Sequence, residues 1–258
     1  MATHEPYPGT QAVLRAIHLL KAFSDAHPEL SLIELTRRVD LNKTTAYRLL
    51  TALESEGLVV RNPETEAYRL GPEVIALGAR AARANDLRSA SRLELIELAQ
   101  QIGETASLEA LQDGQVLILD EAPGAYLIGA TQFIGTRWPA HATSTGKVLL
   151  AHLPEAELKA MLARPLAQLT AKTLTAPEAL RRELVRIREQ GYAVAADELE
   201  VGSMAVGAPI LNHQRQIVAA ISVHGPGARL TPDRLPEVAR QIKAAAERIS
   251  IRLGFKPE

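Results

Sequence analysis

The most constraining feature of the sequence is the segment 31–57, which predicts two short amphipathic helices joined by a sharp turn. Ser31 and Glu34 have the spacing of a capping box, in which a hydroxyl and a carboxylate satisfy backbone amides at a helix start. A helix is therefore expected to begin near Leu32. Apolar residues then recur every three or four positions as far as Val39, which is the spacing of one packed helix face.

The corner after this helix, and the helix that follows it, are predicted from residue types. Asp40 tolerates the left-handed backbone conformation of a sharp turn, and Asn42 is a good N-cap for a helix that begins near Lys43. The apolar side of this second helix is expected to be buried, and it consists of Ala46, Leu49, Leu50 and Leu53. The opposite side carries polar and charged side chains, and Gly57 ends the helix.

A β-hairpin is predicted next, because residues 58–61 and 67–70 have the composition of strands and flank the turn-rich segment 62–66. An apolar stripe between residues 13 and 23 predicts a further helix upstream. Three helices followed by a hairpin are typical of a winged helix-turn-helix, which places one helix in the DNA major groove. The candidate DNA contacts are side chains that bind phosphates or base edges: Asn42, Lys43, Thr44, Thr45, Tyr47, Arg48 and Arg61.

The charge balance shows no strongly basic field. The chain has 29 Lys and Arg against 30 Asp and Glu, and residues 1–84 carry ten of each kind. A basic patch is the usual electrostatic signature of a nucleic-acid binder. A neutral small domain needs two or more copies on paired half-sites to hold DNA at physiological salt, so a homodimer or homotetramer is expected.

The length requires more than one domain. A winged helix needs about 70 residues, whereas this chain has 258 residues and a hydrophobic content of 47%. The absence of cysteine excludes disulfides, thiolate metal sites and cysteine nucleophiles. No signal peptide is evident and no apolar run reaches the roughly 20 residues that span a bilayer, so a cytoplasmic protein without membrane contact is expected.

A linker helix is predicted at 73–85, and the rest of the chain predicts an α+β domain. Strands are expected near 107–111, 115–120, 126–134, 192–196, 204–210 and 216–223, and helices near 87–101, 144–152, 155–163, 177–190 and 234–253. Strands linked by hairpins favour an antiparallel sheet. We expect helices to cover one face of this sheet and to leave the other partly free for a ligand.

Three stretches together resemble the isocitrate-lyase-regulator (IclR) family of bacterial transcription factors. They are LNKTTAYRLL with LESEGL in 41–58, PAHATSTGKVLLA in 139–151, and REQGY, DELEVG, API and AAISV in 188–223. The resemblance covers essentially the whole chain, although relatives often have glycine where this chain has Asp40. It implies a winged helix-turn-helix at 8–72, the linker helix, and a GAF-like effector domain at 86–256. The implied function is ligand-responsive control of a catabolic operon.

The resemblance also implies an effector pocket beside the helix that follows Thr143. The matching positions are Leu127, Trp138, Ser144, Thr145, Gly146, Ala195, Ser203 and Ala205. Amides at a helix N-terminus attract a carboxylate. In relatives that bind small polar oxoacids, the positions of Ala195 and Ala205 carry an acid and a cysteine. The two alanines therefore predict a more apolar pocket for an aromatic or longer-chain carboxylate, with Asp197 and Glu198 outside the ligand contacts.

No enzyme is predicted, and no catalytic, metal or cofactor residues are assigned. Ser144 lacks the flanking glycines of a nucleophile elbow. The segment 143–147 is not a phosphate loop, because that motif needs glycine at the position of His141 and a Ser or Thr at the position of Val148. The seven histidines show no metal-ligand spacing. The alternative function is a ligand-sensing interaction protein whose helix-turn-helix serves dimerisation. The effector, the operator, and the choice between repressor and activator stay open from sequence.

Overall fold

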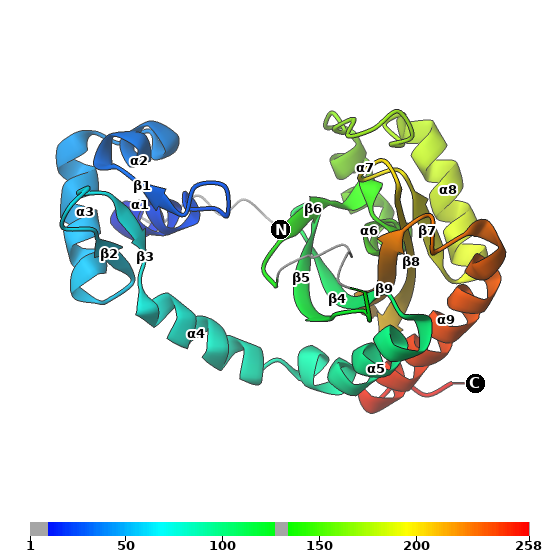
Figure 1. Ribbon diagram of the computed structural model, residues 1–258. Helices are drawn as coiled ribbons and strands as arrows, with labels where there is room; N and C mark the ends of the chain where they lie inside the picture. Colours follow the sequence, from blue (N-terminus) through cyan, green and yellow to red (C-terminus); the bar gives the residue numbers. More distant parts are fainter. Residues whose placement is uncertain (1–9, 127–133, 258) are drawn as a thin grey trace. The chain divides into compact units, whose positions relative to one another are not determined.

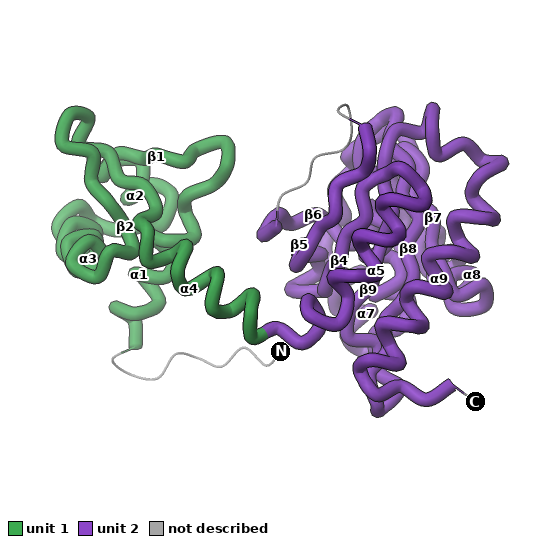
Figure 2. The backbone as a smooth tube through the Cα atoms, turned by 60° about the horizontal axis from the view of Figure 1, so that its bottom comes forward, with its two compact units in different colours: residues 1–84 green, residues 85–258 purple. Residues whose placement is uncertain are grey.

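The computed structural model describes residues 10–126 and 134–257 and divides the chain into two compact units (Figure 2). Unit 1 comprises Met1–Ala84 and unit 2 comprises Asn85–Glu258. The segment predicted as a linker helix, 73–85, largely coincides with helix α4, Pro72–Arg83 (Figure 1), which lies within unit 1 (Figure 2).

Unit 1 has the predicted order of three helices and a hairpin. Its helices are α1 (Gln11–Lys21), α2 (Leu32–Val39) and α3 (Lys43–Ser55), and its strands are β1 (Glu29–Leu30), β2 (Val59–Arg61) and β3 (Tyr68–Leu70). The strands form one antiparallel sheet in the order β1-β3-β2. β1 was not predicted, because two residues are too few to show an alternating pattern. The helices and the hairpin enclose a core that includes Leu19, Leu35, Leu50, Val59 and Tyr68.

Local hydrogen bonds fix the helix-turn-helix as the sequence predicts. The Ser31 hydroxyl accepts the Glu34 amide at 3.3 Å, and the Ser31 amide donates to the Glu34 carboxylate at 2.8 Å. Asp40 adopts a left-handed conformation with φ of 51°. The Asn42 carbonyl oxygen Oδ1 accepts the Thr45 amide at 2.8 Å and thereby caps α3. Both helix starts and the corner between them are therefore determined by short-range interactions.

Unit 2 is built on a six-stranded antiparallel sheet in the order β6-β5-β4-β9-β8-β7. Its strands are β4 (Thr105–Gln112), β5 (Gln115–Ala122), β6 (Arg137–Pro139), β7 (Ala193–Ala196), β8 (Ser203–Leu211) and β9 (Ile217–Pro226). Its α-helices are α5 (Asp86–Ile102), α6 (Ser144–Ala151), α7 (Glu155–Leu162), α8 (Pro177–Gln190) and α9 (Leu235–Arg252). Two short 3₁₀ helices, η1 (Ala140–Ala142) and η2 (Pro232–Arg234), precede α6 and α9. Most of the predicted strand 126–134 lies outside the described residues, and β6 was not predicted.

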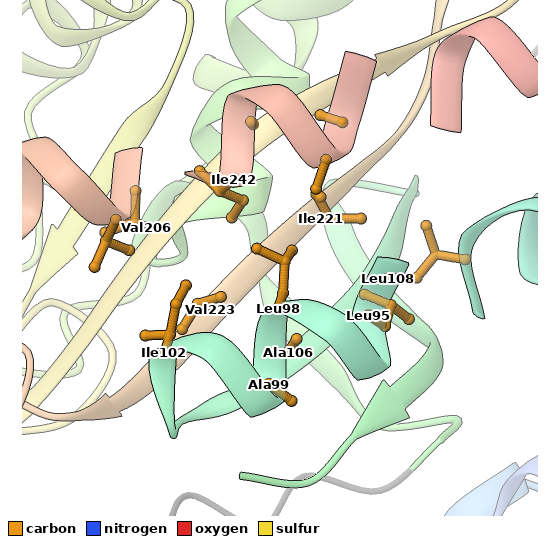
Figure 3. Packing of buried hydrophobic residues seen from close by; sticks show 14 of the residues in the cluster. Leu95, Leu98, Ala99, Ile102, Ala106, Leu108, Val206, Ile221, Val223 and Ile242 are labelled. Atoms are coloured by element: carbon orange, nitrogen blue, oxygen red, sulfur yellow. The ribbon is translucent and has the colours of Figure 1, made fainter. Parts of the chain in front are cut away.

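The sheet is covered by helices on both faces, so the expectation of one covered face is wrong. On one face α5 and α9 pack against side chains such as Leu108, Ile221 and Val223 (Figure 3). On the other face α6, α7 and α8 form a second core that includes Ala220. The physical reason is visible in β9, where the consecutive residues Ala220 and Ile221 are both fully buried. Because neighbours in a strand point to opposite faces, such a strand must be covered on both sides.

Ion pairs join the two helices of the first face. Glu94 of α5 is buried, and its carboxylate contacts the guanidinium groups of Arg248 and Arg252 on α9 at 2.6 Å each. A buried carboxylate left without these partners would cost several kcal/mol, so the two arginines fix the register between α5 and α9.

The left-handed corner at Asp40 gives a stability test. We expect Asp40→Val to lower the free energy of unfolding by about 1–2 kcal/mol, because a β-branched side chain is disfavoured in this conformation. Asp40→Gly avoids that strain and serves as the matched control. Chemical denaturation of both variants checks the prediction, and equal stability of the valine and glycine variants would contradict it.

Candidate functional site

The exposed side of α3 carries the predicted DNA contacts. Asn42, Lys43, Thr44, Tyr47 and Arg48 are exposed, whereas the opposite, apolar side is packed in the core. Thr45 is half-buried, and its amide is the group that the Asn42 cap satisfies. The capping hydrogen bond occupies the carbonyl oxygen of Asn42 and leaves its side-chain amide nitrogen for other partners.

Part of this polar side shares a concave surface with the wing. A hollow of about 550 Å³ is lined by side chains that include Lys43, Thr44, Tyr47 and Arg61. The Arg61 guanidinium contacts the Glu66 carboxylate at 2.7 Å and lies over the Tyr68 ring, 5.9 Å from its centroid. The positive charge of Arg61 is thus partly neutralised by Glu66 of the same hairpin. This agrees with the balanced charge of unit 1.

Six of the eight residues predicted for effector binding line one cavity in unit 2. The cavity has a volume of about 70 Å³, and these six residues are Trp138, Ser144, Thr145, Ala195, Ser203 and Ala205. Leu127 lies outside the described residues. The cavity is enclosed by the N-terminus of α6 on one side and by strands β4, β6, β7, β8 and β9 on the other.

Gly146, the remaining predicted residue, does not line the cavity. Its amide donates to the Thr143 hydroxyl at 3.1 Å, so that amide is used in capping α6. A Cβ atom at Gly146 would overlap the backbone of Ala140. Gly146 is therefore required for close packing of α6 against η1, and the structure removes it from the candidate anion contacts.

A buried carboxylate, Glu109, lines the cavity and was missed by the sequence interpretation. Its two oxygens accept hydrogen bonds from three hydroxyls, those of Ser107 at 2.8 Å, Ser222 at 3.2 Å and Thr145 at 2.5 Å. Burial raises the pKa of the Glu109 carboxyl, and the hydrogen bonds from Thr145, Ser107 and Ser222 lower it; the net direction is upward. The cavity thus has a strongly polar wall.

Strand alternation explains why this polar group forms. In β4, Ala106 and Leu108 join the core with α5 and α9, so Ser107 and Glu109 face the opposite side. Ser107 is directly opposite Ser222 in the antiparallel pair of β4 and β9, and their hydroxyl oxygens are 2.8 Å apart. The alternation of polar and apolar residues in the sequence carried this information, although the strand's two faces were not distinguished there.

The cavity lining carries two acidic residues, Glu109 and Glu200. Glu200 and His224 are among the lining residues, whereas no lysine or arginine is among the described residues that line the cavity. The indole nitrogen of Trp138 is buried and has no hydrogen-bond partner within residues 10–126 and 134–257. It is a donor only, so it suits an acceptor on a ligand.

A buried ion pair holds one end of the cavity together. The Lys147 ammonium on α6 contacts the Glu198 carboxylate at 2.6 Å and donates to the Val194 carbonyl at 2.7 Å. Asp197 pairs with Lys172 at 2.7 Å and accepts the Gly202 amide. Neither acid is among the residues that line the cavity.

The described residues contain neither a metal-binding cluster nor a membrane-spanning helix. Nowhere in 10–126 or 134–257 do three or more His, Asp or Glu side chains come together so as to hold a metal ion. No helix in the same parts of the chain is both long and apolar enough to cross a membrane.

Comparison with known proteins identifies the family. The IclR helix-turn-helix domain matches residues 12–63, and the domain described as "Bacterial transcriptional regulator IclR C-terminal" matches residues 79–251. The chain belongs to the IclR family. Its resemblance to this family, seen in the sequence, is therefore confirmed.

Relatives of this IclR-family chain match it over nearly their full length. The HTH-type transcriptional regulator XynR of Escherichia coli is 34% identical over 96% of this chain and 99% of that protein. An IclR transcriptional regulator from Alicyclobacillus acidocaldarius has a TM-score of 0.86, with 30% identity over 94% of this chain and 98% of that one. An IclR homologue from Microbacterium hydrocarbonoxydans, solved with 4-hydroxybenzoate, has a TM-score of 0.82 and 26% identity over 94% and 98%. The chain is thus a transcriptional regulator and not an enzyme.

Glu121 gives a pH test of the polar face. It is opposite Ser107 in the pairing of β4 and β5, and one of its carboxylate oxygens is buried without a partner among the described residues. Burial, together with the charges of Glu109 and Asp120, raises the pKa of Glu121 from 4.5 to about 7. The protonated form therefore stabilises the folded state below pH 4.5, and this contribution is lost as the pH rises to about 7.

Glu121→Gln removes that titration. At about pH 8 the variant is expected to be more stable than the wild type by about 1–2 kcal/mol, after allowance for solvent screening. Below about pH 4.5 the difference should be small, because both side chains are then neutral. Denaturation curves across this pH range check the prediction, with Glu64→Gln in the exposed wing turn as control. Parallel pH profiles of wild type and Glu121→Gln would contradict it.

Proposed function

We propose that this IclR-family regulator binds operator DNA through α3 and the wing and controls a catabolic operon in response to a small organic carboxylate. The observation that carries the DNA-binding part is the exposed polar side of α3, which shares a hollow with Arg61 of the wing. The effector part is supported by the cavity of unit 2 and its position at the N-terminus of α6. A regulator of this kind acts in the cytoplasm, where its operator lies.

Each DNA-contacting residue has a proposed role that follows from its chemistry. Lys43 and Arg48 neutralise phosphates or bind guanine edges, and Thr44, Thr45 and Tyr47 bind phosphate oxygens. Asn42 contacts DNA through its side-chain nitrogen while its oxygen caps α3. Arg61 reaches the backbone from the wing once its pairing with Glu66 gives way.

The proposed DNA-binding form is a homodimer or homotetramer. Unit 1 has no net charge from its ten basic and ten acidic residues, so a single copy would hold DNA weakly. Helix α4 supports this proposal, because none of its described residues is buried and its Ile75 and Leu77 side chains are exposed. Apolar side chains exposed in this way are stabilised when a second copy of the chain covers them.

The effector is proposed to place its carboxylate at the start of α6. The amides of Ser144 and Thr145 are the first two of that helix and have no hydrogen-bond partner among the described residues. Together with the Trp138 indole they offer three donors to an anion, and the helix dipole favours negative charge there. The Microbacterium relative was solved with 4-hydroxybenzoate, which is also a carboxylate.

The proposed acid is aromatic or has a longer chain. Trp138, Ala195 and Ala205 line the cavity, which supports the prediction of an aromatic or longer-chain acid. The volume of about 70 Å³ is nevertheless small beside the roughly 300–1,000 Å³ of typical ligand pockets. An aromatic acid therefore requires the lining to move outward, whereas a small acid does not.

Operator binding is tested by a gel shift with DNA from the promoter region of the chain's own gene. We expect Lys43→Ala and Arg48→Ala each to weaken binding by at least about tenfold, because each loses a charged contact to the DNA. Arg182→Ala removes the same charge from an exposed position of α8 and should leave binding unchanged. The alternative function, an interaction protein whose helix-turn-helix serves dimerisation, gains support if the wild type does not retard this DNA.

A further inference from the structure

We infer that the effector carries, besides its carboxylate, a group that donates hydrogen bonds, an ammonium or a hydroxyl, and that this group binds Glu109. The inference rests on the proposed role of the cavity as the effector site. It assigns to Glu109 a function in ligand selection that neither the sequence motifs nor the family resemblance indicated.

The hydroxyl hydrogens around Glu109 are used within the group itself. Each hydroxyl has one hydrogen. Thr145 directs its hydrogen to the Glu109 carboxylate, and the Ser107 and Ser222 hydroxyls, 2.8 Å apart, direct theirs to that carboxylate or to each other. The hydrogen bonds that Glu109 accepts favour its ionised form, and in that form the group offers the cavity only lone pairs, from the carboxylate and from the hydroxyl oxygens. A ligand atom that faces this wall must bring its own hydrogen.

The Glu109 carboxylate is buried without a cationic partner among the described residues. Glu109 is 4% exposed, and no lysine, arginine or histidine forms an ion pair with it among the described residues. A buried carboxylate without a cationic partner is costly, so a ligand ammonium gains more there than in water, and a ligand hydroxyl gains a charge-assisted hydrogen bond. A ligand carboxylate at the same place would be repelled by the ionised Glu109.

The hydrogen-bond donors and acceptors of the cavity belong to different elements of the fold. Its donors, the Ser144 and Thr145 amides and the Trp138 indole, belong to the start of α6 and to β6. Its acceptor wall belongs to β4 and β9, which carry Glu109 and Ser222. A simple fatty or aromatic acid satisfies the donors and leaves the acceptor wall without a partner. An amino or hydroxy acid satisfies both.

The test compares acids that share a carbon skeleton, using calorimetry on the full chain. The sets are propionate, lactate and alanine; hexanoate, gluconate and norleucine; and phenylacetate, mandelate and phenylglycine. In at least one set we expect the hydroxy or amino acid to bind at least about tenfold more tightly than the unsubstituted acid, as a hydrogen bond to a charged group predicts. The set that shows this preference identifies the carbon skeleton that fits the cavity. Within that set, the tighter-binding substituted acid shows whether Glu109 prefers a hydroxyl or an ammonium.

Glu109→Gln tests the residue itself. The substitution keeps the shape of the side chain and removes the buried charge, and its thermal midpoint confirms folding. We expect the preference for the substituted acid to fall to less than about threefold, because one acceptor oxygen becomes a donor nitrogen. Glu178→Gln, at an exposed acid of α8 that does not line the cavity, is the control and should keep the full preference.

Three results would overturn the inference. They are equal or tighter binding of the unsubstituted acids to the wild type, no binding of any substituted acid at about 10 mM, and a full preference retained by Glu109→Gln. The gel shift without ligand is run on the same protein preparations. If DNA is retarded while the acids fail, only the ligand assignment fails; if DNA is not retarded, the proposed function fails.

Discussion

The buried ion pair between Lys147 and Glu198 is the interaction on which the architecture of unit 2 depends. The Lys147 ammonium, almost wholly buried, joins α6 to the Val194 carbonyl of β7 and to the segment that leads into β8. Removing one partner of such a pair costs about 3–5 kcal/mol, because the other charge stays buried. The pair therefore holds the N-terminus of α6, with Ser144 and its amide, against the strands that complete the cavity.

The cavity forms because β4 and β9 carry apolar side chains on one face and polar side chains on the other. β4 and β9 send apolar side chains towards α5 and α9, and they send hydroxyls and the Glu109 carboxylate towards α6. A polar wall buried under a helix is stable only when most of its hydrogen bonds are made, and the three hydroxyls fill most of the lone-pair sites of Glu109. The same arrangement leaves room for a ligand that completes the hydrogen bonding, which is the property that a ligand-responsive regulator requires.

The sequence predicted best what short-range interactions determine. The capping box at Ser31, the left-handed Asp40 and the Asn42 cap each act within four residues, and all three are confirmed. Six residues of the cavity were found through the family resemblance. Glu109 was missed because its importance depends on Ser222, a partner more than a hundred residues away, and Gly146 was misjudged because its contact with Ala140 is a matter of packing. The strands β1 and β6 were too short to show a period.

The central claim is that occupancy of the cavity in unit 2 changes the affinity of unit 1 for DNA. The most direct measurement is fluorescence anisotropy of a labelled promoter fragment titrated with the full chain, with and without a saturating acid that calorimetry shows to bind the cavity. Coupling between two sites typically changes affinity by about 5–150-fold, so we expect the dissociation constant for DNA to shift at least about fivefold. The same dissociation constant with and without the bound acid would contradict the account.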